Sequence, residues 1–424
     1  MANPITQRDI ISCLVKFVDD EQYLFFAGVS RGWRNAWGKR QSRTRAVTAH
    51  TTVSQLRQSF ECGQPLQTTV CRAAAALGEL DLLQCAREYG CPWDADTCSY
   101  AAENRHLEIL QWCRGVERCP WDADTCTMAA RRGFLEVLEW CRSNGCECNE
   151  EASKLAALEG HLEVVKWLKL NGCPWSTDTC YGAARGGHLD VLEWCRRNGC
   201  EWNKWTTAGA AGAGHLDVLR WARENGCVWD EDACHLAALE GHLHIVKFAR
   251  LHGCPWDEEV MCSTAAEGDH LEVLKYAREQ GCPWGPDTCY YAAEGGHLEV
   301  LKYAREGGCA WDNSICAAAA EGSHLEVLKY AREGGCPWDE YTCAAAAAGG
   351  HLEVLKYAHE GGCPWSTDTC VAAAEGGHLE VLKYAREGGC PWDENTCAGA
   401  AKGGHLEVLK YAREGGCPWD EITC

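Results

Sequence analysis

The sequence predicts an all-α, ankyrin-like helical solenoid of about thirteen helix-turn-helix repeats, preceded by a small helical N-terminal segment. One phrase, typified by GHLEVLKYAREGGCPWDE, recurs almost unchanged along the C-terminal half. Each copy alternates two runs of helix-favouring residues with turns rich in glycine and proline. A single copy has too little apolar surface to fold alone, so neighbouring copies must stack to bury their apolar stripes.

The period of the repeat is 27 residues. The histidine of the recurring phrase advances by 27 residues at every step except one step of 28, falling at His161, His188, His215, His242, His270, His297, His324, His351, His378 and His405. The same register places His106 in phase, Phe134 at an imperfect copy and Glu79 at a degenerate first copy. Thirteen repeats are therefore predicted.

Residues 368–377 illustrate the first helix of a repeat. Asp368 and Thr369 are residue types favoured at helix N-caps, and the run CVAAAE that follows favours a short helix. Gly376 and Gly377 then predict its end.

The second helix of this repeat is predicted from His378 onward. The run LEVLKYARE places Leu379, Leu382 and Ala385 on one stripe, and it pairs Glu380 with Lys383 three residues later. A tight connection, Cys390-Pro391-Trp392-Asp393, then leads to the next first helix at Thr396.

The distribution of charge divides the chain. The protein has 61 Asp and Glu against 40 Lys and Arg, a net charge of −21, yet residues 1–47 carry eight basic and four acidic side chains. We therefore expect a helical segment at 1–47, a connector with a degenerate first repeat at 48–69, and the solenoid at 70–424. The acidic balance argues against a nucleic-acid partner, because phosphates require a basic surface.

The sequence suggests a soluble protein in a reducing compartment, the cytoplasm or the nucleus. The N-terminus lacks a basic region followed by an apolar run, and no stretch approaches the ~20 apolar residues of a membrane span. We expect no membrane partner. The 32 cysteines are then expected to be reduced, since disulfide scaffolds are typically short secreted chains.

The segment GHLEVLK at 377–383, followed by Gly388-Gly389-Cys390, resembles the ankyrin repeat, as does the Thr-x-x-x-Ala-Ala-x-x-Gly-His pattern that ends at His378. The resemblance covers residues 70–424. The Pro and His of the family's Thr-Pro-Leu-His motif are missing, and the repeat is about six residues short. The resemblance implies a helical stack in which short loops replace the β-hairpin fingers. A rigid stack that changes a few exposed positions per repeat predicts a scaffold that binds a protein through its concave face.

The N-terminal segment is similar to an F-box in Asp9-Ile10-Ile11, Leu14 and the phrase Val29-Ser30-Arg31-Gly32-Trp33-Arg34, although Ile5-Thr6 replaces the family's opening Leu-Pro. This resemblance implies a substrate receptor that docks a ubiquitin-ligase adaptor through Ile10, Leu14, Leu24, Val29 and Trp33. The alternative is that these residues form a helical cap for the solenoid.

Cysteine recurs at two positions of the repeat, once in each loop and once in most first helices. Core packing explains this pattern, because free cysteine is among the most buried residue types. A zinc site of Cys363, Cys370 and His378 is an alternative, but its Cys-x₆-Cys spacing differs from the close pairs of structural zinc sites. A redox-responsive array is the remaining alternative.

The repeated histidine and tryptophan are interpreted as structural. Catalysis needs one asymmetric group of residues, and near-identical copies do not supply one, so we predict neither enzyme activity nor a cofactor. The ankyrin resemblance implies that the histidine hydrogen-bonds the backbone of its own turn. The loop tryptophans are expected to pack on neighbouring helices with the indole N–H bonded to backbone; an aromatic ladder for ligands is the alternative.

The two positions after the first-helix cysteine vary most between repeats. Our candidate protein-binding residues are Tyr100, Met128, Tyr181, His235, Tyr290 and Tyr291, in the repeats of residues 99–295. The nearly identical repeats from about Glu294 onward are interpreted as a spacer. We expect the C-terminal end to expose Leu406, Leu409 and Ala412 and to allow self-association.

Overall fold

The computed structural model describes residues 47–48, 51–63, 65–116, 118–285 and 287–418, and every regular element in these ranges is an α-helix. There are 27 helices, and the predicted all-α repeat fold is confirmed. The F-box-like residues Ile10, Leu14, Leu24, Val29 and Trp33 lie outside the described residues, as does Cys424.

Helix α4 (Val53–Glu61) precedes thirteen consecutive helix pairs, the number predicted from the spacing. In each pair the odd-numbered helix is called the first helix and the even-numbered helix the second. The pairs are α5 (Thr68–Leu77) with α6 (Leu80–Glu88), α7 (Ala95–Glu103) with α8 (Leu107–Gly115), α9 (Ala123–Arg131) with α10 (Leu135–Ser143), α11 (Glu150–Leu158) with α12 (Leu162–Leu170), α13 (Thr177–Gly186) with α14 (Leu189–Arg197), α15 (Lys204–Gly212) with α16 (Leu216–Glu224), α17 (Glu231–Leu239) with α18 (Leu243–Leu251), α19 (Glu258–Glu267) with α20 (Leu271–Glu279), α21 (Thr288–Glu294) with α22 (Leu298–Glu306), α23 (Asn313–Glu321) with α24 (Leu325–Glu333), α25 (Glu340–Ala348) with α26 (Leu352–Glu360), α27 (Thr367–Glu375) with α28 (Leu379–Glu387), and α29 (Glu394–Lys402) with α30 (Leu406–Glu414).

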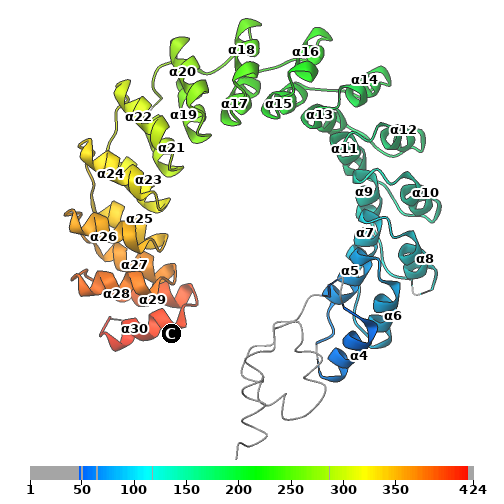
Figure 1. The fold of residues 1–424 in the computed structure, drawn as a ribbon, viewed down its shortest axis with the longest axis horizontal. Helices are drawn as coiled ribbons and strands as arrows, with labels where there is room; N and C mark the ends of the chain where they lie inside the picture. Colours follow the sequence, from blue (N-terminus) through cyan, green and yellow to red (C-terminus); the bar gives the residue numbers. More distant parts are fainter. Residues whose placement is uncertain (1–46, 49–50, 64, 117, 286, 419–424) are drawn as a thin grey trace, which may run out of the picture. The chain divides into compact units, whose positions relative to one another are not determined.

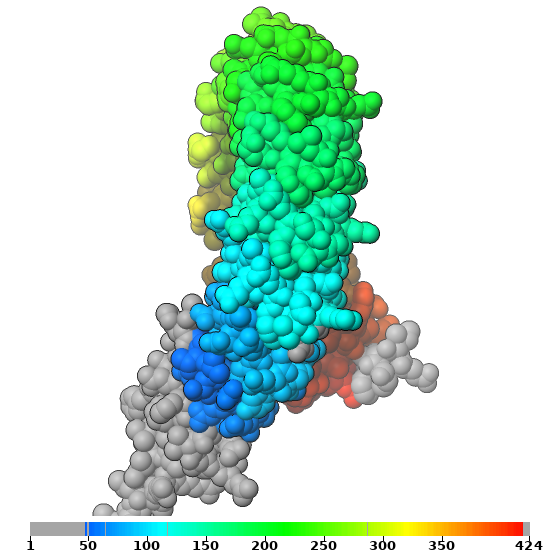
Figure 2. All heavy atoms as spheres, turned by 90° about the vertical axis from the view of Figure 1, so that its right-hand side faces the viewer, coloured from blue at the N-terminus to red at the C-terminus, as the bar shows by residue number. Residues whose placement is uncertain are grey.

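The chain forms two compact units, residues 1–206 and residues 207–424, with the boundary inside α15. Within each unit, a first helix contacts the first helix of the next repeat far more extensively than the corresponding second helices contact each other. Each unit therefore curves with its first helices on the inner side (Figure 1). The outer side of the first unit is a continuous surface of second helices and loops (Figure 2).

Most first helices begin earlier than predicted; α21, with Asp287 as its N-cap, begins at the predicted position. Helix α27 begins at Thr367 with Ser366 as its N-cap, so Asp368 and Thr369 lie inside the helix, and the next first helix begins at Glu394 instead of Thr396. In most repeats the residue directly after the Trp of the loop is the N-cap. In α29 the Asp393 side chain accepts a hydrogen bond from the Asn395 N–H. The prediction was wrong because both positions carry capping residue types.

The turn between the helices requires glycine for two reasons. Gly377 has φ +76°, a backbone conformation that other residues rarely adopt. A Cβ at this position would also lie 2.5 Å from Nδ1 of His405 in the following repeat. The predicted turn is thus confirmed, and it is shaped by the neighbouring repeat as well as by its own residues.

The second helix packs largely as predicted. Val381, Leu382 and Ala385 are buried, Leu379 is half-buried, and Glu380 pairs with Lys383 at 2.7 Å on the solvent side. At the C-terminal end Leu406 is 60% exposed and Leu409 is half-buried. Ala412 is buried, contrary to the prediction, because it packs on Cys397 and Cys417. No helix in the described ranges is long and apolar enough to cross a membrane.

Candidate functional site

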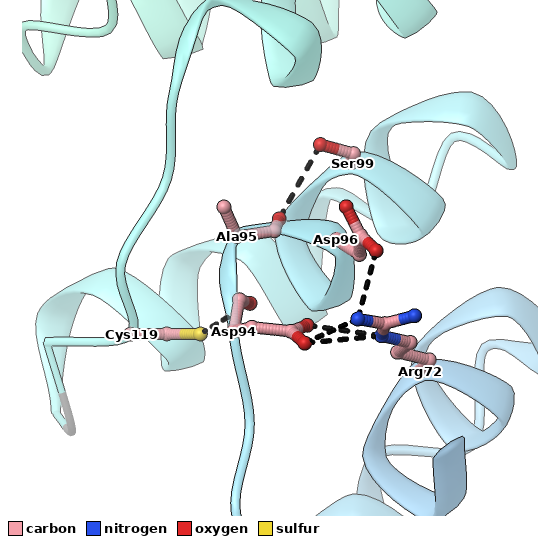
Figure 3. A network of polar contacts seen from close by, with 6 residues as sticks. All are labelled: Arg72, Asp94, Ala95, Asp96, Ser99 and Cys119. Atoms are coloured by element: carbon pink, nitrogen blue, oxygen red, sulfur yellow. Dashed lines mark hydrogen bonds and ion pairs between the residues drawn. The ribbon is translucent and has the colours of Figure 1, made fainter. Parts of the chain in front are cut away.

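In three repeats the residue directly after the first-helix cysteine bonds the next repeat. Arg72 of α5 hydrogen-bonds the carboxylate of Asp94, the N-cap of α7, with Nε 3.1 Å from Oδ1 (Figure 3). Its Nη2 also pairs with Asp96 at 2.9 Å. The guanidinium hydrogen bond is the main reason that the pKa of Asp94 lies below its ordinary value. This position therefore joins repeats.

Two further repeats show the same arrangement. Thr127 donates its hydroxyl to Asn149 Oδ1 at 3.0 Å, and Asn149 is the N-cap of α11. The candidate residue His235 accepts a hydrogen bond at 3.4 Å from the backbone N–H of Asp257, the N-cap of α19. His235 therefore already has a hydrogen-bond partner within its own chain, so it is a weaker candidate for contacting another protein.

On α7 and α9 the second position after the cysteine is more accessible than the first. Tyr100 is 41% exposed on α7, while Met128 on α9 and Tyr291 on α21 are half-buried. Tyr100 and Met128 lie on consecutive first helices that contact each other. Among the candidates of the first unit, these two are the pair that lies on neighbouring first helices.

Tyr181 and Tyr290 occupy the first position and are half-buried. The Tyr181 hydroxyl accepts a hydrogen bond from Arg185 at 3.2 Å. Tyr290 lies edge-on to Tyr291, with ring centroids 5.6 Å apart, and its hydroxyl is 3.4 Å from Glu294 Oε1. Burial, followed by the charge of Glu294, raises the pKa of Tyr290.

Sequence comparison missed a third accessible position, five residues after the cysteine. It carries Glu103 on α7, Arg131 on α9 and Arg185 on α13, and Leu158 on α11, where Ser153 replaces the cysteine; all are half-buried or exposed. The second and fifth positions are three residues apart, so they lie on the same helix face. Helical periodicity is the signal that identifies this position.

The repeated histidine links neighbouring repeats. Nε2 of His378 lies 3.0 Å from the carbonyl oxygen of Ala348, the last residue of the first helix in the preceding repeat. The contact recurs for His106, His297, His324, His351 and His405 at 2.8 to 3.2 Å. The prediction that each histidine bonds its own turn is wrong, because stacking brings a carbonyl of the preceding repeat closer.

The loop tryptophan packs between two repeats. In the first unit, Trp93 lies under the guanidinium of Arg87, 4.1 Å from the ring centroid, and edge-on to Trp112 of the next repeat at 5.8 Å. The predicted packing is confirmed, and the indole N–H of Trp284 donates to the Gly307 carbonyl at 2.7 Å. The indole N–H groups of Trp256 and Trp365, however, are buried without an acceptor.

The loop cysteine of a repeat hydrogen-bonds the start of the first helix in the same repeat. The thiol of Cys390 donates to the carbonyl of Ser366, the N-cap of the first helix in the same repeat, at 3.2 Å. All described cysteines are free thiols, and nearly all are buried, as predicted for core packing. Burial is the leading cause that raises the pKa of Cys71 and of Cys262 to about 12.

The zinc set of Cys363, Cys370 and His378 is not assembled. Cys363 bonds the Asp339 carbonyl at 3.0 Å, and His378 faces Ala348 instead. Within the described ranges, no group of three or more Cys, His, Asp or Glu side chains has the arrangement of a metal site.

Comparisons with known proteins return helical repeat structures. No protein-family model and no curated protein sequence matches the chain. Among solved structures, the maize pentatricopeptide repeat protein PPR10 is 16% identical with a TM-score of 0.34, over 97% of this chain and 74% of that one. The human ASB11 ankyrin repeat domain is 16% identical with a TM-score of 0.31, over 37% of this chain and 84% of that one. The chain is a helical repeat protein.

Proposed function

We propose that the protein is a scaffold that binds a protein partner on its first-helix face, through the repeats within residues 99–295. The observation that carries the proposal is the contrast between buried and accessible positions of the first helix. Each first helix from α5 to α27 buries the same pair of alanines, such as Ala101 and Ala102 on α7 or Ala129 and Ala130 on α9. Two accessible positions beside them change from repeat to repeat.

The side chains at these variable positions belong to types that are common at protein interfaces. In the first unit they carry Tyr100 and Glu103 on α7, then Met128 and Arg131 on α9. Tyrosine, methionine and arginine are enriched at protein interfaces. A uniform frame with variable accessible residues is how repeat proteins obtain specific surfaces. The repeated histidines serve stacking, so no catalytic role is proposed for them.

An affinity pull-down from native cell extract tests this proposal. The wild-type chain is compared with a Tyr100→Ala, Met128→Ala variant and with a Leu170→Ala control, because Leu170 is 83% exposed at the end of a second helix. The proposal expects a prey protein to be retained by wild type and control and to be lost from the double variant. Circular dichroism spectra must coincide, so that unfolding does not explain the loss.

The same assay tests the F-box-like segment. A chain that lacks residues 1–47 is expected to keep its first-helix-face partner but to lose a ubiquitin-ligase adaptor, if the segment docks one. Identical prey for both chains would leave residues 1–47 as a cap of the solenoid.

A further inference from the structure

One loop of the first unit carries a cysteine where every other loop carries tryptophan. This residue, Cys148, lies between α10 and α11, and Glu147 precedes it in place of the proline found in most loops. Nearly all described cysteines are buried, but Cys148 is half-buried, and Cys62 is the other described thiol of this kind. A thiol thus occupies an accessible position that an indole ring fills elsewhere.

A second thiol lies against Cys148. A loop cysteine reaches the N-cap of the first helix in its own repeat, as Cys119 does at the carbonyl of Asp94, 3.4 Å away (Figure 3). In the repeat of α11 and α12 the corresponding residues are Cys173 and Asn149, and Asn149 directly follows Cys148. The thiols of Cys148 and Cys173 hydrogen-bond each other. The residue before α11 and the loop after α12 therefore meet through two sulfur atoms.

Cys173 is the thiol best placed to react with Cys148. Its own repeat lacks the first-helix cysteine, because Ser153 takes that position and donates its hydroxyl to the carbonyl of Pro174 at 2.9 Å. Cys126 also hydrogen-bonds Cys148, but it is fully buried on α9 and shared with two thiols of its own repeat. Both Cys148 and Cys173 lie in loops, and without proline at Glu147 the backbone there can adjust.

An arginine lies next to this thiol pair. In the preceding repeat Arg114 lies over Trp121, 4.2 Å from the ring centroid. Arg142 is the equivalent residue here, and its Nη1 donates to the loop carbonyl of Cys146 at 2.8 Å. With no indole ring in this loop, the positive charge of Arg142 acts on Cys148.

These contacts favour the thiolate of Cys148. Hydrogen bonds from Cys126 and then from Cys173, together with the charge of Arg142, lower the pKa of Cys148 below its ordinary value of 9.0, although burial opposes them. A partly exposed thiolate beside a cationic side chain is the reactive form of cysteine. Contacts also lower the pKa of Cys98 and Cys200, but those two thiols are buried.

We propose that Cys148 is an oxidation site for hydroperoxides and that Cys173 resolves the oxidised form to a disulfide. The Cys148 thiolate attacks the O–O bond and takes one oxygen, which gives a sulfenic acid. The other oxygen takes a proton and leaves as an alcohol, or as water when the oxidant is hydrogen peroxide. The Cys173 sulfur then displaces the sulfenic hydroxyl, which leaves as water with the Cys173 thiol proton. Two thiols lose two electrons, and one hydroperoxide gains them.

The disulfide closes one repeat covalently. Cys148 precedes α11 and Cys173 follows α12, so the bond joins the two ends of this helix pair. A closed loop has less conformational freedom in the unfolded chain, so the oxidised protein is expected to resist urea more than the reduced protein. The oxidation site does not depend on whether the first-helix face binds a protein.

Disulfide mapping by mass spectrometry tests the proposal. The reduced full-length protein is treated with a small molar excess of hydrogen peroxide, its remaining thiols are alkylated, and it is digested without reduction. The peptides that contain Cys148 and Cys173 are expected to be joined in the main disulfide product. A main disulfide between Cys148 and Cys126, a sulfinic acid at Cys148 without a disulfide, or an unreacted Cys148 would each overturn the proposal.

Two matched serine variants test the role of Cys173. In Cys173→Ser the sulfenic acid of Cys148 has no resolving thiol, so its adduct with dimedone is expected to increase at least about fivefold. Cys200→Ser removes the loop cysteine of the next repeat and is expected to leave the adduct and the disulfide at wild-type levels. Equal increases in the two variants would contradict the assignment. Circular dichroism checks their folding, and the mapping of the wild-type protein needs neither variant.

A second pair of variants tests the role of the arginine. Arg142→Gln is expected to slow the reaction of Cys148 with hydrogen peroxide by about fivefold, because the thiolate loses a nearby positive charge. Arg114→Gln removes the equivalent arginine over Trp121 and is expected to change this rate by less than about twofold. Equal rates in the two variants would show that Arg142 does not activate the thiol.

Discussion

Nε2 of His378 lies 3.0 Å from the carbonyl oxygen of Ala348, thirty residues earlier in the chain. A carbonyl oxygen only accepts hydrogen bonds, so Nε2 carries the proton. The same ring lies over Gly350, the glycine with φ +76° that ends the preceding repeat's turn. Histidine and glycine of successive repeats therefore form one inter-repeat contact.

Replacing this histidine should weaken the coupling between repeats. His378→Ala is expected to lower the free energy of unfolding by about 1 kcal/mol and to broaden the urea transition, because an inter-repeat hydrogen bond is lost. His252→Ala is the control, since His252 bonds only Phe248 of its own helix, at 2.8 Å. Equal broadening by both changes would contradict the inter-repeat role.

Replacing a glycine that lies against the histidine of the next repeat should lower the free energy of unfolding more than replacing another glycine with positive φ. Gly389→Ala, at φ +86° with no atom within 4 Å of its Cβ, is expected to cost about 1–2 kcal/mol for the backbone alone. Gly377→Ala should cost more, because its Cβ would lie 2.5 Å from His405 Nδ1. Urea unfolding of both variants measures the difference, and similar losses would refute the crowding argument.

One repeat lacks an arginine that its neighbouring repeats carry, and restoring it should stabilise the protein. His359 replaces the arginine that elsewhere donates to the loop carbonyl, as Arg332 does to Cys336 at 2.6 Å. Its Nδ1 and the indole N–H of Trp365 are buried without hydrogen-bond partners. His359→Arg is expected to raise the free energy of unfolding by about 0.5–2 kcal/mol. A thermal unfolding midpoint that does not rise would show that the arginine contact contributes nothing.

The pair Arg72–Asp94 predicts a pH dependence with a definite sign. The pKa of Asp94 is lowered from its ordinary value of 3.8, so its stabilising contribution is present above that pH and is lost as pH falls through the lower folded-state value. Asp94→Asn should therefore destabilise the protein at pH 7, by no more than ~1 kcal/mol for these one-third-exposed groups, and progressively less below pH ~4. A difference that grows on acidification would contradict this assignment.

The buried thiols should resist modification in the folded protein. A pKa of about 12 for Cys71 and Cys262 leaves almost no thiolate at pH 8. Ellman's reagent is expected to react at once only with a few accessible cysteines, with Cys62 and Cys148 the half-buried candidates, and with all of them in 8 M urea. Rapid reaction of most thiols in native buffer, or stoichiometric zinc in the purified protein, would revive the metal or redox alternative.

The repeat and its number were predictable because they depend on local sequence. The spacing of His161, His188 and the later histidines defines thirteen repeats without reference to tertiary structure. The partner of each histidine was not predictable in this way, because the carbonyl of Ala348 reaches His378 only when repeats stack. Helix starts were misplaced where two capping residue types, Ser366 and Asp368, compete within three residues.

The binding face was only partly predictable. Variation between repeats selects both positions after the cysteine, but only stacking shows that the first of them bonds the next repeat in some repeats, as at Thr127. Tyr100 and Met128 remain accessible or half-buried beside Glu103 and Arg131, which sequence variation alone did not select.

Photo-crosslinking from the first-helix face tests the central claim most directly. A photoreactive phenylalanine derivative at position 100 is compared with the same residue at position 170, at the end of second helix α12 in the same unit. After irradiation in native cell extract, we expect one discrete protein adduct from position 100 and none from position 170. Adducts from position 170 alone, or the same adducts from both positions, would contradict a partner site on the first-helix face.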